Sequence, residues 1–156
     1  MKILFVVDLQ KQFKDENGKY DKCLKFIEEN KDNYDSIVAT VFTQDLYGVR
    51  NPNFVRNLNY TDCAKSSKED LEFYDKSTRV VFKNGYGVPS VCFADNDDII
   101  DVIGCDTDAC LLACCFQLWD THKNFRVLTD YIYSVGDVDG DYALRLLKRN
   151  FGKCII

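Results

Sequence analysis

Short apolar runs recur along the chain, separated by polar or amphipathic segments of helical length. The runs are rich in β-branched and aromatic residues, which is typical of buried β-strands. We predict strands at Lys2–Val7, Ser36–Phe42, Thr78–Phe82, Asp98–Ile103 and Phe125–Thr129, and a short final strand at Cys154–Ile156. Apolar residues at helical spacing predict helices at Cys23–Asn30, from Cys110 to Asp120, and at Val138–Asn150.

Predicted strands and helices therefore alternate, and this pattern is typical of α/β proteins. Right-handed crossovers place helices on both faces of a parallel sheet, so we expect a three-layer α-β-α, Rossmann-like domain with a doubly wound sheet. The stretch from Asp45 to Lys76 shows no strand pattern and is expected to form loop with one or two helical turns. Because 156 residues suffice for one core but not for two, we expect a single domain at 1–156.

Composition narrows the class of partner. The net charge is −5 and the sequence has no Lys/Arg cluster, which argues against nucleic acid or an anionic membrane surface as partner. No apolar run approaches the ~20 residues of a transmembrane helix, and no secretion signal precedes the first strand. We therefore expect a cytoplasmic protein that acts on a small molecule; whether it forms a homo-oligomer is left open.

Cys110 is the strongest candidate for a chemical role. It lies in the predicted first turn of a helix, where unpaired N–H groups and the helix dipole favour the thiolate. Asp8 and Lys83 each follow an apolar predicted strand. Ligands of open parallel sheets bind at the carboxyl ends of the strands, so a carboxylate, an ammonium and a thiol are expected to meet there. Lys83 would stabilise the thiolate and Asp8 would move the proton, which makes Cys110 the expected most reactive thiol.

These segments resemble the isochorismatase-like cysteine hydrolases, which include nicotinamidases and N-carbamoylsarcosine amidases. The resemblance rests on Val6 to Phe13, on Val81-Phe82-Lys83 and on Gly104 to Leu111. It implies six strands in the order 3-2-1-4-5-6 and a catalytic triad of Asp8, Lys83 and Cys110. The implied activity is cleavage of a C–N bond in a small carboxamide, carbamoyl or ureido compound, through a thioester on Cys110.

The resemblance also implies details of the site. A cis peptide bond at Cys105–Asp106 would place the backbone N–H groups of Asp106 and Cys110 as an oxyanion hole. Phe13 matches an aromatic residue of the substrate pocket in family members and would stack on a planar substrate; a hydrophobic plug over the first helix stays an alternative. Tyr47, Tyr86 and Phe93 are further candidates for the substrate-binding wall.

The chain departs from the nicotinamidases at their metal site, which consists of one aspartate and two histidines. Asp45 matches the aspartate, but Tyr47 and Asp62 stand where the histidines are expected. Zinc and iron prefer imidazole or thiolate ligands, so we predict no such metal and no cofactor. Asp45 and Asp62 are expected to be solvated, although a hard cation stays an alternative. His122, the single histidine, is expected to interact with the end of the helix that begins at Cys110.

The eight cysteines are spread over the chain without a short-loop framework, so reduced thiols are expected. Two alternatives to a hydrolase stay open. One is a catalytically idle binding protein on the same fold, which the retention of Asp8, Lys83 and Cys110 disfavours. The other is a redox protein in which Cys105 or Cys114 resolves an oxidised Cys110.

Overall fold

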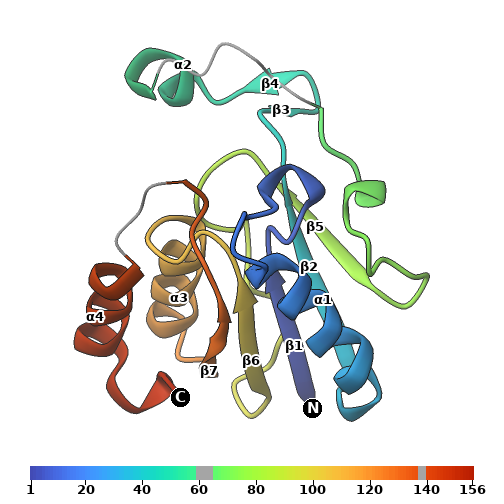
Figure 1. The fold of residues 1–156 in the computed structure, drawn as a ribbon, viewed down its shortest axis with the longest axis vertical. Helices are drawn as coiled ribbons and strands as arrows, with labels where there is room; N and C mark the ends of the chain where they lie inside the picture. Colours follow the sequence, from blue (N-terminus) through green and yellow to red (C-terminus); the bar gives the residue numbers. More distant parts are fainter. Residues whose placement is uncertain (59–64, 137–139) are drawn as a thin grey trace.

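The computed structural model describes residues 1–58, 65–136 and 140–156. Its centre is a parallel sheet in the order β5-β2-β1-β6-β7 (Figure 1). The strands are β1 (Lys2–Val7), β2 (Ser36–Phe42), β5 (Arg79–Lys83), β6 (Ile99–Gly104) and β7 (Asn124–Ile132). Five of the six predicted strands are therefore confirmed, in the expected α/β arrangement.

The expected sixth strand is absent from the described residues. The chain instead forms the short 3₁₀ helix η4 (Gly152–Cys154), and Ile155 makes one isolated parallel bridge to Val127 of β7. The bridge lies on the outer edge of β7, where the sixth strand was expected. Cys154, which the prediction assigned to the strand, belongs to η4, and the pairing with β7 consists of this bridge and the two backbone hydrogen bonds of Ile156 with Val127 and Thr129.

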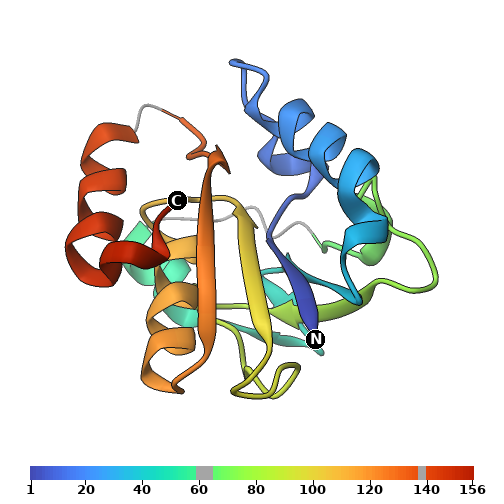
Figure 2. The same ribbon diagram turned by 90° about the horizontal axis from the view of Figure 1, so that it is seen from below.

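Helices cover both faces of the sheet. α1 (Lys19–Asn30) packs on one face, and α3 (Cys110–Asp120) and α4 (Gly140–Phe151) pack on the other (Figure 2). Side chains alternate along β1, so that Phe5 joins the core under α3 and α4 whereas Leu4 joins the core under α1.

Two helix boundaries differ from the predicted ones: α1 begins earlier, and α4 ends at Phe151, one residue beyond the predicted Asn150. α1 begins four residues before the predicted Cys23, because the Asp15 carboxylate accepts the N–H groups of Asn17, Lys19 and Tyr20 and thereby caps the helix. The predicted start of the last helix, Val138, lies outside the described residues. The 3₁₀ helices η1 (Lys11–Phe13) and η2 (Lys31–Asn33) flank α1.

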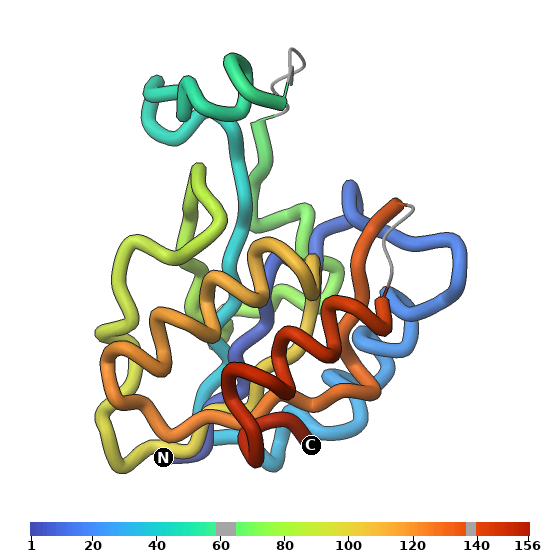
Figure 3. Tube along the Cα trace, turned by 90° about the vertical axis from the view of Figure 1, so that its left-hand side faces the viewer, coloured from blue at the N-terminus to red at the C-terminus, as the bar shows by residue number. Residues whose placement is uncertain are grey.

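An arm of the chain projects beyond the carboxyl ends of the strands (Figures 1 and 3). It consists of the antiparallel pair β3 (Asp45–Leu46) and β4 (Val49–Arg50), followed by α2 (Pro52–Leu58). The sequence did not predict the β3–β4 hairpin, because this stretch was expected to form a loop. The helical turns expected in the same stretch are confirmed by α2. The 3₁₀ helix η3 (Lys68–Asp70) lies on the way back to β5. Within the described ranges, no helix has the length and apolar character needed to cross a membrane.

Candidate functional site

Asp8 and Lys83 meet at the carboxyl ends of β1 and β5. Nζ of Lys83 lies 2.7 Å from Oδ2 of Asp8, and both side chains are only 1% exposed. Cys110 is the first residue of α3, and the charges of Asp8 and Lys83 both shift the pKa of its thiol. The structure therefore brings together the three residues that the sequence singled out.

Asp8 is held in an unusual backbone conformation, with φ 47°. Its N–H donates to Oγ1 of Thr40 (2.9 Å), and its Oδ1 accepts from the same hydroxyl (2.6 Å). Its carbonyl oxygen accepts from the N–H of Gln10 (2.8 Å) and from Sγ of Cys105 (3.3 Å). These contacts fix the position of the carboxylate.

Lys83 is buried but well coordinated. Its ammonium donates to the carbonyl oxygens of Gly85 and Tyr86, both at 2.9 Å, and lies 5.3 Å from the ring centre of Phe42. Burial by itself lowers the pKa of Lys83, but the charge of Asp8, followed by that of the Cys110 thiolate, raises it overall. Lys83 is therefore a permanent cation of the site.

The Cys110 thiol differs from the expected resting thiolate. Burial raises its pKa above the usual range, the Asp8 charge raises it further, and the Lys83 charge opposes both. The sequence indicated the helix terminus and the cation, but it did not show how strongly the site is desolvated. The free site therefore holds a thiol beside a carboxylate, and attack requires transfer of a proton.

The loop before Cys110 has the backbone that the resemblance implied. The peptide bond Cys105–Asp106 is cis. The carbonyl oxygen of Asp106 accepts the N–H groups of Ala109 and Leu111. The N–H groups of Asp106 and Cys110 donate in none of the hydrogen bonds that join the described residues.

Gly104 is required at the end of β6. Its φ is 116°, and a Cβ there would collide with the carbonyl oxygen of Val7. β6 and β1 can approach each other closely only because this residue has no side chain. Any larger residue would move the loop that carries Cys110 away from Asp8.

The predicted wall residues fall into three groups. The ring of Phe13 lies 6.3 Å from that of Phe42, and the ring of Tyr86 lies 5.3 Å from that of Phe54. Tyr47 is 90% exposed at the turn of the β3–β4 hairpin. Phe93 is buried against Phe5 in the core and is not a wall residue.

Sequence reasoning missed Phe42 and Phe54. Their rings lie 5.3 Å apart and connect Phe13 with Tyr86 in one aromatic row beside Lys83. Phe42 ends β2 just as Asp8 follows β1, and this equivalent position was a usable signal. Phe54 lies in α2, whose seven residues carry too little periodicity to be predicted.

The residues at the expected metal position do not fit zinc or iron. The Asp45 carboxylate faces the ammonium of Lys65 at 3.9 Å, and Tyr47 points into solvent. Asp62 lies outside the described residues. Among the residues that the structure describes, no group of three or more His, Cys, Asp or Glu side chains is arranged to hold a metal ion. His122 follows α3, as expected, with φ 59°.

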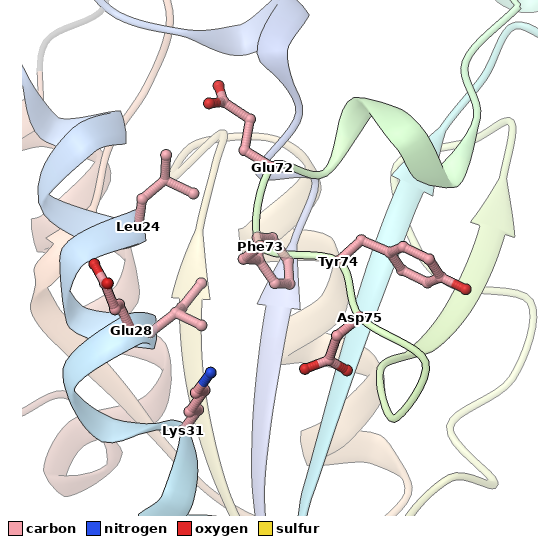
Figure 4. A pocket seen from close by; sticks show the side chains of 8 residues that line it. Leu24, Glu28, Lys31, Glu72, Phe73, Tyr74 and Asp75 are labelled. Atoms are coloured by element: carbon pink, nitrogen blue, oxygen red, sulfur yellow. The ribbon is translucent and has the colours of Figure 1, made fainter.

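Two cavities contrast in chemistry. One of about 460 Å³ lies between α1 and residues 72–75 (Figure 4). Its lining comprises Leu24, Ile27, Glu28, Lys31, Glu72, Phe73, Tyr74 and Asp75 and includes no nucleophile. The other, about 240 Å³, is formed by α2 and Tyr86, whose carbonyl oxygen coordinates Lys83. The second cavity therefore shares Tyr86 with the surroundings of Lys83, although Asp8, Lys83 and Cys110 are not among the residues that line it.

Known structures share this architecture. The pyrazinamidase/nicotinamidase of Streptococcus mutans UA159 has 17% sequence identity and a TM-score of 0.74, with 100% of both chains covered. The N-carbamoylsarcosine amidase of Thermoplasma acidophilum has 15% identity and a TM-score of 0.75, with 97% of this chain and 93% of that one covered. An isochorismatase-like hydrolase of Alkaliphilus metalliredigens has 13% identity and a TM-score of 0.68, with 95% and 90% covered.

No family model matches the chain, and no curated protein matches it. The likeness is therefore one of three-dimensional structure at low sequence identity, over almost the whole length of the chain. The chain has the fold of the isochorismatase-like hydrolases, which it shares with nicotinamidases and N-carbamoylsarcosine amidase.

Proposed function

We propose that the protein is a cysteine hydrolase that cleaves a C–N bond of a small carboxamide, carbamoyl or ureido compound. The observation that carries the proposal is the buried Asp8–Lys83 ion pair beside the thiol of Cys110. Burying such a pair is costly unless its geometry is well satisfied, and here it lies at the edge of the sheet where ligands of this architecture bind. The activities of the structural neighbours point to the same class of substrate.

The first half of the reaction forms a thioester. Asp8 removes the proton from Sγ of Cys110, and the sulfur electron pair attacks the carbonyl carbon of the substrate. The resulting oxyanion accepts hydrogen bonds from the N–H groups of Asp106 and Cys110, each contributing about 3 kcal/mol. Asp8 then gives its proton to the leaving nitrogen, and the C–N bond breaks to release ammonia or an amine.

The second half regenerates the enzyme. Asp8 takes a proton from water, and the hydroxide attacks the thioester carbon. The C–S bond breaks, the acid product leaves, and the sulfur recovers the proton. Lys83 stays charged throughout, because its raised pKa keeps it protonated, and it stabilises the transient thiolate.

An ammonia-release assay across nicotinamide, carbamoyl and ureido compounds tests this proposal, with mass spectrometry of the Cys110 peptide to trap the thioester. Cys110→Ser and Asp8→Asn are expected to abolish release. Cys92→Ser, which changes an exposed thiol, is the matched control and keeps full activity. Undiminished turnover by Cys110→Ser would disprove the nucleophile, and no turnover on any compound would favour the idle binding protein.

Thiol labelling needs one precaution. Cys92 is exposed, and its pKa is lowered chiefly by a hydrogen bond with Ser90. It will therefore compete with Cys110 for a small electrophile, so the expectation that Cys110 is the most reactive thiol is tested by comparing the two. Labelling of Cys110 is best measured in the Cys92→Ser background.

A further inference from the structure

The hydroxyl of Thr40 contacts Asp8 at two atoms. It accepts the backbone N–H of Asp8 at 2.9 Å and donates its own proton to Oδ1 at 2.6 Å. Thr40 is 0% and Asp8 is 1% exposed, so water does not compete for these bonds. Because a hydroxyl has one proton to donate, its orientation is settled by the carboxylate.

The two carboxylate oxygens of Asp8 consequently differ. Oδ1 is held by Thr40, whereas Oδ2 accepts no well-aligned hydrogen bond and has the Lys83 ammonium beside it at 2.7 Å. An ammonium with two of its protons directed at the carbonyl oxygens of Gly85 and Tyr86 leaves acceptor capacity open on Oδ2. Oδ2 is therefore the oxygen with room for a further proton.

The position of Thr40 in the sheet also singles it out. β2 lies between β1 and β5, the strands that lead to Asp8 and Lys83. The neighbours of Thr40 along β2, Ala39 and Val41, are apolar and buried. A hydroxyl at such a place costs stability unless it is hydrogen-bonded, and a valine would fill the same volume. The two hydrogen bonds of the Thr40 hydroxyl are both with Asp8.

We propose that Thr40 is a positioning residue that dedicates Oδ2 of Asp8 to proton transfer with Cys110. This inference rests on the proposed function. In the acylation step the S–H bond of Cys110 breaks and an O–H bond forms at Oδ2, while Oδ1 keeps its bond to Thr40. When the leaving nitrogen takes that proton, the same O–H bond breaks and the carboxylate is restored.

The test uses p-nitrophenyl acetate as an acylating probe. Its leaving group departs without a proton, so the burst of p-nitrophenolate reports only proton removal from Cys110 and attack by its sulfur. The variants are Thr40→Val, which replaces the hydroxyl by a methyl group, and Thr40→Ser, which keeps the hydroxyl. Thr40→Ala, which also lacks the hydroxyl, serves where the valine variant does not fold.

Thr78→Val is the matched control. Thr78 is also buried and donates its hydroxyl to an aspartate carboxylate, Oδ1 of Asp75 at 3.2 Å, but it precedes β5 at the opposite end of the sheet. It therefore loses the same kind of bond without touching Asp8. Circular dichroism and thermal melting confirm that each variant is folded.

Thr40→Val and Thr40→Ala are expected to acylate about 10²-fold more slowly than the wild type, since a misplaced base costs this much. Thr40→Ser keeps the hydroxyl and is therefore expected to restore most of the lost rate, which a purely structural role of the residue 40 methyl group would not explain. Thr78→Val is expected to acylate at the wild-type rate, because Thr78 contacts Asp75 and not Asp8.

Folded Thr40→Val or Thr40→Ala protein with the wild-type acylation rate would overturn the role of Thr40 while leaving the hydrolase proposal intact. An equal loss of rate in Thr78→Val would also overturn it, because the effect would then be a general loss of stability. Wild-type protein that is never acylated at Cys110 would overturn the proposed function, and the inference with it.

Discussion

The carboxamide of Gln117 on α3 pairs with the backbone of Val88 through two hydrogen bonds of 2.7 Å, one accepted from the N–H and one donated to the carbonyl oxygen. Gln117 lies two turns beyond Cys110 on the same helix. Val88 closes the loop whose Gly85 and Tyr86 carbonyl oxygens coordinate Lys83. α3, which carries Cys110, therefore also fixes the loop of residues 85–88. This loop coordinates the Lys83 ammonium, so the positions of Cys110 and Lys83 are linked.

Gly87→Ala should break this link. A Cβ at residue 87 would collide with the carboxamide of Gln117, which would have to leave Val88. Because the N–H and carbonyl groups of Val88 would lose their partners, we expect the free energy of unfolding to fall by about 1–3 kcal/mol. Urea unfolding measures it. Gly85→Ala is the control from the same loop, since its Cβ would meet only Asn51, 3.9 Å away; equal losses in both variants would contradict the link.

Lys83→Met should slow alkylation of Cys110. The Lys83 charge lowers the pKa of this thiol against the effects of burial and of Asp8, so its removal raises the pKa further. At any given pH less thiolate is present, and the curve of iodoacetamide labelling rate against pH moves to higher pH. The measurement uses the Cys92→Ser background, with Lys65→Met, an exposed lysine, as control. Coincident curves for Lys83→Met and its parent would show that the Lys83 charge does not act on the Cys110 thiol.

Much of the fold was predictable because buried parallel strands have continuous apolar sequences. Asp8, Lys83 and Cys110 were recognisable because each follows such a run. Thr40 left a signal too, as the polar residue inside the apolar run Ile37–Phe42, but a lone threonine says nothing about its partner. Contacts between segments far apart in the chain, such as that of Thr40 with Asp8, needed the structure.

Other features were beyond sequence reasoning for a physical reason. β3 and β4 have two residues each, and so short a pairing carries no periodicity. The raised pKa of Cys110 depends on desolvation by residues from several elements, which no local pattern reports. The sixth predicted strand does not form because Cys154 belongs to the 3₁₀ helix η4, and a three-residue helix leaves no periodic pattern in the sequence.

The buried thiols should make the protein less stable in alkaline solution. Burial raises the pKa of Cys23 to about 12, and its Sγ donates to the carbonyl oxygen of Tyr131 at 3.2 Å. The unfolded chain ionises this thiol near pH ~8.5, so the native state binds the proton more tightly. The stabilisation is complete below that pH and is lost as the pH rises toward about 12, at about 1.4 kcal/mol per pH unit for each such thiol.

Urea unfolding at a series of pH values between about 7 and about 10 measures this slope. Cys23→Ala should flatten it, because one proton fewer is linked to folding. Val38→Ala shortens a buried side chain without removing an ionisable group and should leave the slope as it is. Parallel slopes for Cys23→Ala and the wild type would show that Cys23 ionises equally in both states.

The last prediction concerns the metal. Purified protein is expected to contain no stoichiometric zinc or iron, because Asp45 faces the Lys65 ammonium and Tyr47 and Asp62 stand where imidazoles are needed. Chelators should therefore leave amide hydrolysis unchanged. Nicotinamide should be a poor substrate, since its ring nitrogen finds no metal, whereas ureides or amides that are held by hydrogen bonds and by the aromatic row Phe13, Phe42, Phe54 and Tyr86 stay suitable. Elemental analysis tests the first point, and the ammonia-release assay with and without chelator tests the second. One equivalent of tightly bound zinc, or rapid nicotinamide hydrolysis that a chelator stops, would contradict the prediction. Either result would show that residues other than Asp45 and Tyr47 build a metal site in this chain.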